Sequence, residues 1–132
     1  MSWDRTSATQ ALAAAIEANL TALADTASVF DTPPATLNAS AIVIGRITEV
    51  RYSDAIIGID TAELPVSAVA GLGDDARVTE LLSIIRSSVP PGNATLGGAV
   101  QICVATAERN WRHMNIAGAD LSAADVIFTI RM

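Results

Sequence analysis

The sequence contains no lysine, a single cysteine and a single histidine. Zinc and transition-metal sites are built from clusters of histidine, cysteine and carboxylate ligands, which one His113 and one Cys103 cannot supply. Cys103 lies in the mostly apolar run 100–104, where a thiol is usually a small buried hydrophobe and where no positive charge lowers its pKa. We therefore expect no metal site, no disulfide within the chain and no catalytic Cys–His pair.

Positive charge is scarce and scattered. Eight arginines carry all of it against 14 acidic residues, and the formal net charge is −6. Nucleic-acid binding requires a clustered basic surface, whereas acids separate these arginines along the chain. Arginine without lysine is typical of a GC-rich genome, and the planar guanidinium also suits contacts between subunits. The charge balance argues against a protein that holds nucleic acid.

Aromatic residues are also few, at 4% of a chain that is 51% hydrophobic. The core must come from alanine, valine, isoleucine and leucine, and a shallow core of this kind favours further burial against copies of the same chain. The length fits one domain covering residues 1–132. Residues 1–5 lack the basic region and apolar run of a signal peptide, and polar residues interrupt the alanine-rich stretch that follows. We expect no membrane segment and folding in a cytoplasm.

Two segments have the apolar spacing of amphipathic helices. The first covers residues 7–25, where Ser7 and Gln10 can form an N-terminal capping box. The second has Asp74 as its N-cap and runs to about Ser87. In both segments apolar residues recur at steps of three and four, which predicts one buried face on each helix. These residues are Leu12, Ile16, Leu20 and Leu23 in the first segment, and Val78, Leu81, Leu82 and Ile85 in the second.

Four segments read as strands, because β-branched or alternating apolar residues dominate them. Pro65 cannot donate a ladder hydrogen bond, so its strand should begin after it or lie at a sheet edge. Residues 31–34 predict a loop, and residues 93–98 a turn or one helical turn. The order of helices and strands predicts an α+β fold, a mainly antiparallel sheet with two helices packed on it. The expected strands are 40–47, 62–70, 100–109 and 123–131.

The polar residues do not form a catalytic set. Asp74 and Asp75 open a helix, where the helix dipole favours acids without any catalytic role. The glycines of 71–73 lack the remainder of a phosphate-binding motif, and the acid-rich segments 54–63 and 120–125 lack the spacing of a calcium loop. We expect no enzyme and no cofactor.

The segment Arg109-Asn110-Trp111-Arg112 is the best candidate for a contact surface. Tryptophan and arginine are the side chains most enriched at the energetic centres of interfaces, and here they alternate at the end of a predicted strand. The alternative is a tryptophan folded over the sheet edge beside two solvated arginines. Arg51 and Tyr52 complete the set of interface candidates, while His113 is expected in a polar connection beyond the strand.

The whole arrangement resembles the tail-terminator (minor tail) proteins of long-tailed bacteriophages, particularly those of phages with high-GC hosts. The resemblance covers nearly the entire chain and contains no catalytic motif. The Gly97-Gly98 pair departs from the family pattern, because two glycines weaken the small helical segment that is usual at this place. The resemblance rests on the first helix leading into 31–34, the strand 41–45, the segment 69–77 that opens the second helix, and the segments 92–100, 109–112 and 116–118.

The resemblance implies a homo-oligomeric ring, usually a hexamer, that caps the tail tube, ends its growth and joins the tail to the connector (stopper) protein of the head. DNA would pass through the ring without specific binding. The protein would be located in the virion neck, after assembly in the host cytoplasm. Another head–tail connector or a neck or tail-completion protein would have the same properties. A small ligand-binding domain is a third alternative, which a deep pocket with converging polar groups would favour.

Overall fold

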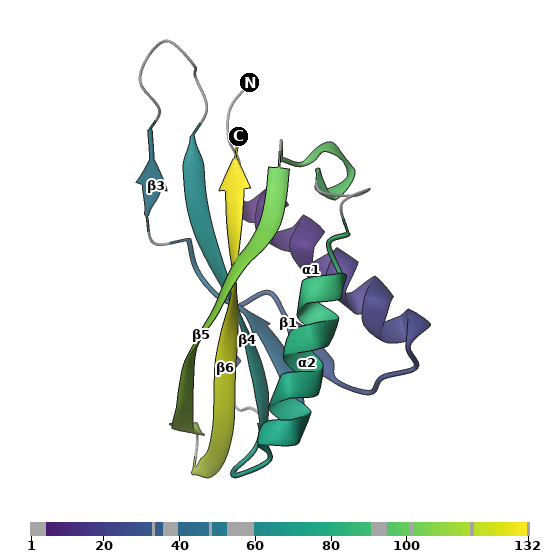
Figure 1. The fold of residues 1–132 in the computed structure, drawn as a ribbon, viewed down its shortest axis with the longest axis vertical. Helices are drawn as coiled ribbons and strands as arrows, with labels where there is room; N and C mark the ends of the chain where they lie inside the picture. Colours follow the sequence, from purple (N-terminus) through teal and green to yellow (C-terminus); the bar gives the residue numbers. More distant parts are fainter. Residues whose placement is uncertain are drawn as a thin grey trace.

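A computed structural model of the protein describes residues 5–32, 34–35, 40–47, 49–52, 60–90, 95–100, 102–116 and 118–131. The elements are α1 (Arg5–Ala22), β1 (Ser28–Phe30), β2 (Ala41–Ile44), β3 (Val50–Arg51), β4 (Thr61–Gly71), α2 (Asp75–Ser87), the 3-10 helix η2 (Leu96–Gly98), β5 (Ile102–Ile116) and β6 (Ala119–Arg131). The strands form one mixed, mostly antiparallel sheet in the order β1-β2-β4-β6-β5, and β3 pairs with β4. Both helices lie on one face of this sheet (Figure 1), so the predicted α+β fold is confirmed.

Helix α1 has the predicted buried face over most of its length. Leu12, Ile16 and Leu20 are buried in the main core, whereas Leu23 is 58% exposed because the helix ends at Ala22. The predicted capping box is wrong, since α1 already begins at Arg5 and Ser7 therefore lies inside its first turn.

Helix α2 agrees with its prediction at both ends. The Asp74 carboxylate accepts a hydrogen bond from the backbone N–H of Arg77 at 3.2 Å, and all four predicted core residues are buried. At the other end of α2, the Asn19 side-chain amide donates to the Ile84 carbonyl oxygen at 3.0 Å. Helix α1 thus satisfies one of the terminal carbonyls that a helix leaves without an internal partner.

Strand β6 lies between β4 and β5 and is buried on both faces from Leu121 to Phe128. Its helix-side residues Val126 and Phe128 belong to the main core, which contains both helices. On the opposite face, a second and smaller apolar cluster contains no helical residue. Its buried members are Ala41, Val69, Leu121 and Ala123.

Pro65 lies in the middle of β4, between β2 and β6, so the prediction of a strand start or a sheet edge is wrong. The Pro65 carbonyl oxygen accepts from the Gly45 N–H at 2.7 Å, just beyond the last β2–β4 pair of Ile44 with Val66. Pro65 has no N–H with which to return this bond, and the β2–β4 ladder ends here, so the proline removes at most the last hydrogen bond of that ladder. Gly45 permits this approach, because a Cβ there would lie 2.7 Å from Pro65 Cγ.

The last two strands form a longer hairpin than predicted. Strand β5 continues to Ile116 instead of ending at Arg109, and β6 begins at Ala119. The polar second half of β5 resembles a loop in sequence because it is an exposed edge strand. The sequence also missed β1, a strand of three residues that pairs in parallel with β2.

Several predicted connections are described only in part. In the predicted loop 31–34, Pro33 lies outside the described residues. The predicted turn at 93–98 contains η2, although residues 93 and 94 also lie outside them. Of the acid-rich segment 54–63, the structure describes only residues 60–63.

An ion pair ties α2 to the connection between α1 and β1. Arg77 donates to both carboxylate oxygens of Asp25, at 2.7 and 2.9 Å, and its Nε donates to Ser40 Oγ at 3.1 Å. Both charged side chains are mostly buried, at 18% and 11% exposure. The hydrogen bonds from Arg77 hold the pKa of Asp25 at about 2, below its ordinary value of 3.8.

We predict that Asp25→Asn lowers the free energy of unfolding by about 2 kcal/mol at neutral pH, the energy equivalent of this pKa shift. The folded-state pKa of Asp25 is depressed, so its contribution is complete above the unfolded value and is lost as pH falls from about 4 to about 2. Urea unfolding of both proteins across this range measures the difference. Glu80→Gln, which removes only the exposed partner of Arg77, should change stability by less than about 1 kcal/mol. An Asp25→Asn effect that does not shrink with acidification would contradict the prediction.

Candidate functional site

The segment Arg109-Asn110-Trp111-Arg112 forms a bulge within β5, so its predicted place at a strand end is wrong. Arg109 pairs with Asp125 of β6 and Arg112 with Ala123, so that two residues of β5 lie opposite Ala124. Asn110 has a φ of 62°, a left-handed conformation that asparagine tolerates better than most residues. The bulge directs Arg109 and Arg112 to the same sheet face, the one without helices, because Ala123 and Asp125 share that face.

A buried carboxylate organises the bulge. Asp125 is 6% exposed and accepts hydrogen bonds from Ser67 Oγ at 2.7 Å, Asn110 Nδ2 at 3.2 Å and an Arg112 guanidinium nitrogen at 3.0 Å. Arg112 also donates to Ser67 Oγ at 3.3 Å. A buried charge is costly unless it is paired and hydrogen-bonded, and these contacts supply both. We call Ser67, Asn110, Arg112 and Asp125 the Asp125 network.

The other candidate arginines form exposed ion pairs. Arg109 contacts Glu63 at 3.1 Å and Arg51 contacts Glu49 at 2.7 Å, with all four side chains more than half exposed. Exposed pairs of this kind contribute about 0–1 kcal/mol, so these arginines can exchange their present partners for others at little cost. Tyr52, next to Arg51, is 81% exposed.

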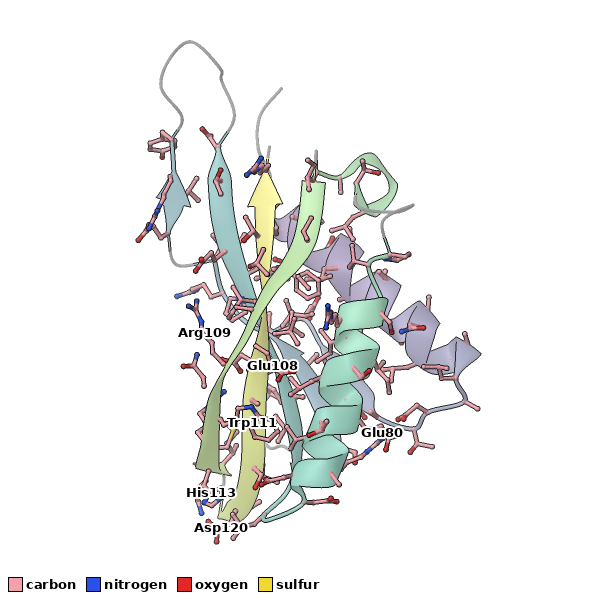
Figure 2. All side chains as sticks on the ribbon, viewed as in Figure 1. Glu80, Glu108, Arg109, Trp111, His113 and Asp120 are labelled. Carbon is pink, nitrogen blue, oxygen red and sulfur yellow. The ribbon has the colours of Figure 1, made fainter. Side chains whose placement is uncertain are left out.

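Trp111 lies apart from the two arginines that flank it. It is 46% exposed and lines a shallow recess with Asp75, Arg112 and His113, beside the first turn of α2. Figure 2 shows its side chain toward α2, whereas Arg109 lies on the other side of β5. His113 is a residue of β5, and its prediction in a connection beyond the strand is wrong. The structure therefore brings Arg109 and Arg112 to one face but not Trp111. Arg51 lies on β3, and Tyr52 directly follows that strand.

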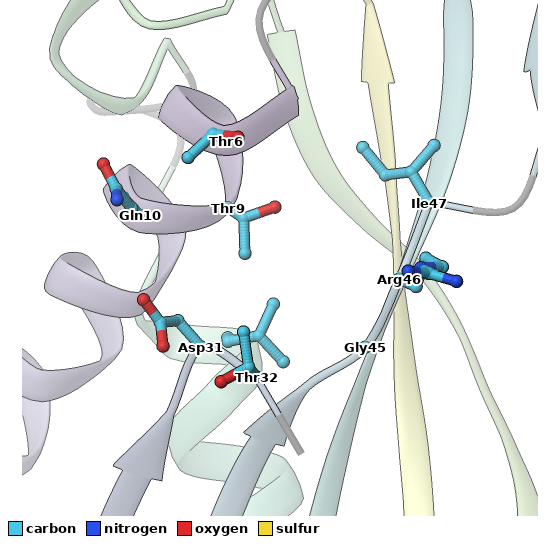
Figure 3. A pocket seen from close by; sticks show the side chains of 9 residues that line it. Thr6, Thr9, Gln10, Asp31, Thr32, Gly45, Arg46 and Ile47 are labelled. Atoms are coloured by element: carbon cyan, nitrogen blue, oxygen red, sulfur yellow. The ribbon is translucent and has the colours of Figure 1, made fainter. Parts of the chain in front are cut away.

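A second candidate site is a recess of about 660 Å³ between the first turns of α1 and the segments that follow β1 and β2 (Figure 3). Thr6, Thr9 and Gln10 line it from α1, and Asp31 and Thr32 line it from the other side. These groups can form hydrogen bonds with a polar ligand. The described lining of the recess contains no histidine or cysteine.

Cys103 is buried as the sequence predicts. Burial raises the pKa of its thiol to about 12, which keeps it protonated at neutral pH. Cys103 lies opposite Ile130 and His113 opposite Ser122, eight residues apart along β6, which corresponds to about 26 Å. The two side chains therefore cannot act as a catalytic pair.

Asp125 and Ser67 were not among the candidate site residues predicted from the sequence, and Asn110 was named only as a member of the segment 109–112. Asp125 carried a usable signal, since a lone carboxylate within the apolar run 121–130 must find a partner if the strand is buried. No feature of the sequence pointed to Ser67 or to a role for Asn110, because only the β4–β6–β5 register places them beside Asp125.

The described part of the chain contains no group of three or more histidine, cysteine or carboxylate side chains that could hold a metal ion. None of its helices has the length and apolar character needed to cross a membrane. Comparison of the chain with protein-family models and with curated proteins found no match.

We predict that Asp125→Ala destabilises the protein by roughly 1–3 kcal/mol, because Ser67, Asn110 and Arg112 lose a shared acceptor in a mostly buried setting. Glu63→Ala is the matched control, since it removes an exposed carboxylate from the same sheet face. It should cost less than about 1 kcal/mol. Chemical unfolding at neutral pH measures the free energy of unfolding of both variants. Equal losses of stability would show that the Asp125 network contributes no more than an exposed ion pair.

We also predict that Cys103 reacts with a thiol-specific maleimide only after the protein unfolds. Burial limits access to the sulfur, and the raised pKa leaves almost no thiolate at neutral pH. Labelling followed by mass spectrometry, with and without urea, measures the difference. Rapid labelling of the native protein would contradict the buried position.

Proposed function

We propose that this chain is a structural protein of bacteriophage assembly that caps the tail tube as a ring, ends tube growth and joins the tail to the head connector. The ring is homo-oligomeric, with six copies as the resemblance to tail-terminator proteins implies. It acts in the neck of the virion, after assembly in the host cytoplasm. Its function is non-enzymatic and depends on surfaces that contact further copies, the tube protein and the connector protein.

The observation that carries the proposal is the division of the sheet into two different faces. Both helices cover one face, and the other presents the exposed ion pairs of Arg51 and Arg109 at its surface. Side chains that are exposed and only weakly paired can be used in contacts with neighbouring protein at low cost.

The electrostatics support a channel through which DNA passes. The net charge of −6 gives the protein no general attraction for phosphate. Arg112 is held by Asp125, and Arg109 and Arg51 are each paired with a glutamate. A ring with these properties can surround DNA without holding it.

Another neck or tail-completion protein would share this fold and charge. The two functions differ in the partner that the protein binds, because a terminator binds the end of the tail tube whereas other neck proteins bind the connector. Incubation of the purified protein with isolated tail tubes, followed by negative-stain imaging, distinguishes them. Density at one end of the tubes is expected, and a protein that never associates with tubes would contradict the terminator assignment.

We predict that Trp111→Ala disturbs assembly. If the half-exposed indole is a central interface residue, its truncation should cost about 2 kcal/mol or more per contact, roughly thirtyfold in affinity, and a ring repeats the loss at every junction. Tail length and sedimentation measure the effect, after circular dichroism has shown that the variant folds. Leu23→Ala is the control, because Leu23 is similarly exposed at the end of α1. Tails of normal length and unchanged sedimentation would remove Trp111 from the interface.

A further inference from the structure

At one end of the sheet, β3 and the first residues of β5 are the two edge strands, on opposite sides of the sheet. The register places Arg51, Thr61, Arg131 and Ile102 side by side in one row across β3, β4, β6 and β5. At this end the sheet is thus four strands wide, with β3 at one side and the start of β5 at the other (Figure 1). Among the described residues, β3 pairs only with β4 and β5 only with β6.

The first residues of β5 lack the features that normally protect an edge strand. Native proteins block sheet edges with charges, prolines or bulges, because unpaired backbone groups attract other strands. Beyond Ala105, β5 has two register shifts and the charges of Glu108, Arg109 and Arg112. The segment Ile102–Ala105 is regularly paired and contains no charge, proline or bulge.

This unprotected segment also exposes aliphatic surface. Ile102 is 41% exposed and Val104 is 45% exposed, both on the sheet face without helices. On the helix side, Val50, Ala62, Ile130 and Cys103 form an apolar row that runs across the sheet and stops at β5. A further strand beside β5 would extend this row and cover both exposed aliphatic side chains.

The strand directions permit β3 of one copy to pair with the free edge of β5 in the next copy. Each of the pairs β3–β4, β4–β6 and β6–β5 is antiparallel, so β3 and β5 run in opposite directions. A rotation about an axis parallel to the strands preserves strand direction. Such a rotation would bring β3 of a second copy beside β5 of the first in antiparallel orientation, with a regular hydrogen-bonded ladder.

We propose that the edge of Ile102–Ala105 in one copy pairs with the edge of β3, extended to Tyr52, in a second copy of this chain. Val50 of the second copy would continue the apolar row next to Cys103. The aliphatic stems of Glu49 and Arg51 would cover Ile102 and Val104, while their charged ends stay in water.

The contact joins two different surfaces, so it repeats head to tail and closes into a ring when the rotation permits. It therefore rests on the proposed ring function and names the surface that would build the ring. The neighbouring sheets would join into one continuous sheet around the ring axis, which leaves neither edge exposed.

Disulfide trapping between copies tests the contact directly. In a Cys103→Ala background, Arg51→Cys is combined with either Ile102→Cys or Val104→Cys. Within one copy, β3 and β5 are separated by two strands, about 14 Å, which exceeds the Cα separation of about 7 Å that a disulfide can span. Any disulfide therefore joins two copies, and mild oxidation should give a ladder of oligomers on non-reducing gels.

The single-cysteine variants show which edges meet. Because one cysteine can join only two chains, each should stop at a dimer even under forced oxidation. Efficient dimerisation of the Val104→Cys variant alone would indicate symmetric pairing of β5 with β5 and would overturn the proposal. Absence of a ladder in both double variants, as purified protein and after incubation with tail tubes, would also overturn it.

A charge placed on the edge provides a second test without cysteines. Val104→Glu should weaken self-association by about tenfold or more, because the new carboxylate would lie opposite Glu49 of the second copy, and like charges directly opposite each other destabilise a strand pair. Thr129→Glu is the matched control, since it adds the same charge to the same face one strand inward, opposite Val104. After circular dichroism has shown that both variants fold, sedimentation should show the loss for Val104→Glu only, and equal behaviour of the two variants would contradict the edge contact.

These outcomes separate the contact from the function. Wild-type protein that caps tail tubes in micrographs but gives no disulfide ladder would keep the proposed function and reject this contact. A ladder together with no binding to tubes would support the contact and reject the terminator assignment.

Discussion

The ladder between β4 and β6 is the constraint on which the rest of the structure depends. It pairs the whole of β4, Thr61–Gly71, with Leu121–Arg131, without a register shift. Both strands lie inside the sheet, so a slip of one strand by one residue against the other would carry its apolar helix-side residues to the opposite face. The regular β4–β6 register fixes the main core, and it also places Ser67 of β4 beside Asp125 of β6.

The parts of the fold that the sequence predicts are those in which local chemistry and tertiary packing agree. In α2 the N-cap Asp74 and the apolar stripe specify the same helix, and the structure contains it as expected. For α1 the same reasoning identified the helix but misplaced its ends. Leu23 fits the stripe by spacing, yet it follows the last helical residue and points into solvent. Periodicity identifies a face more reliably than it identifies a boundary.

The errors arise where contacts distant in sequence override local preference. Pro65 is acceptable inside β4 because it lies where the β2–β4 ladder ends, beside a glycine that permits close approach. The left-handed Asn110 and the exposed residues of β5 resemble a loop until β6 supplies their partners. Of the candidate interface residues, Arg112 contacts a buried carboxylate, and this pairing depends on the same bulge. Arg51, Tyr52, Arg109 and Trp111 were predicted as interface residues by their type, but their division among different surfaces follows from strand order and the bulge.

The position of β6 in the chain has a consequence for synthesis. It leaves the ribosome after β4 and β5, yet β5 has no other described partner and β4 makes its longest ladder with it. Until residues 119–131 emerge, both strands keep a free edge next to apolar side chains, and such surfaces promote association between nascent chains on one message. The sheet must then close in a late step with long-range pairing, which is intrinsically slow. A chain interrupted before β6 cannot complete the sheet, so β3, β4 and β5 take their places beside one another only after residues 119–131 have been made.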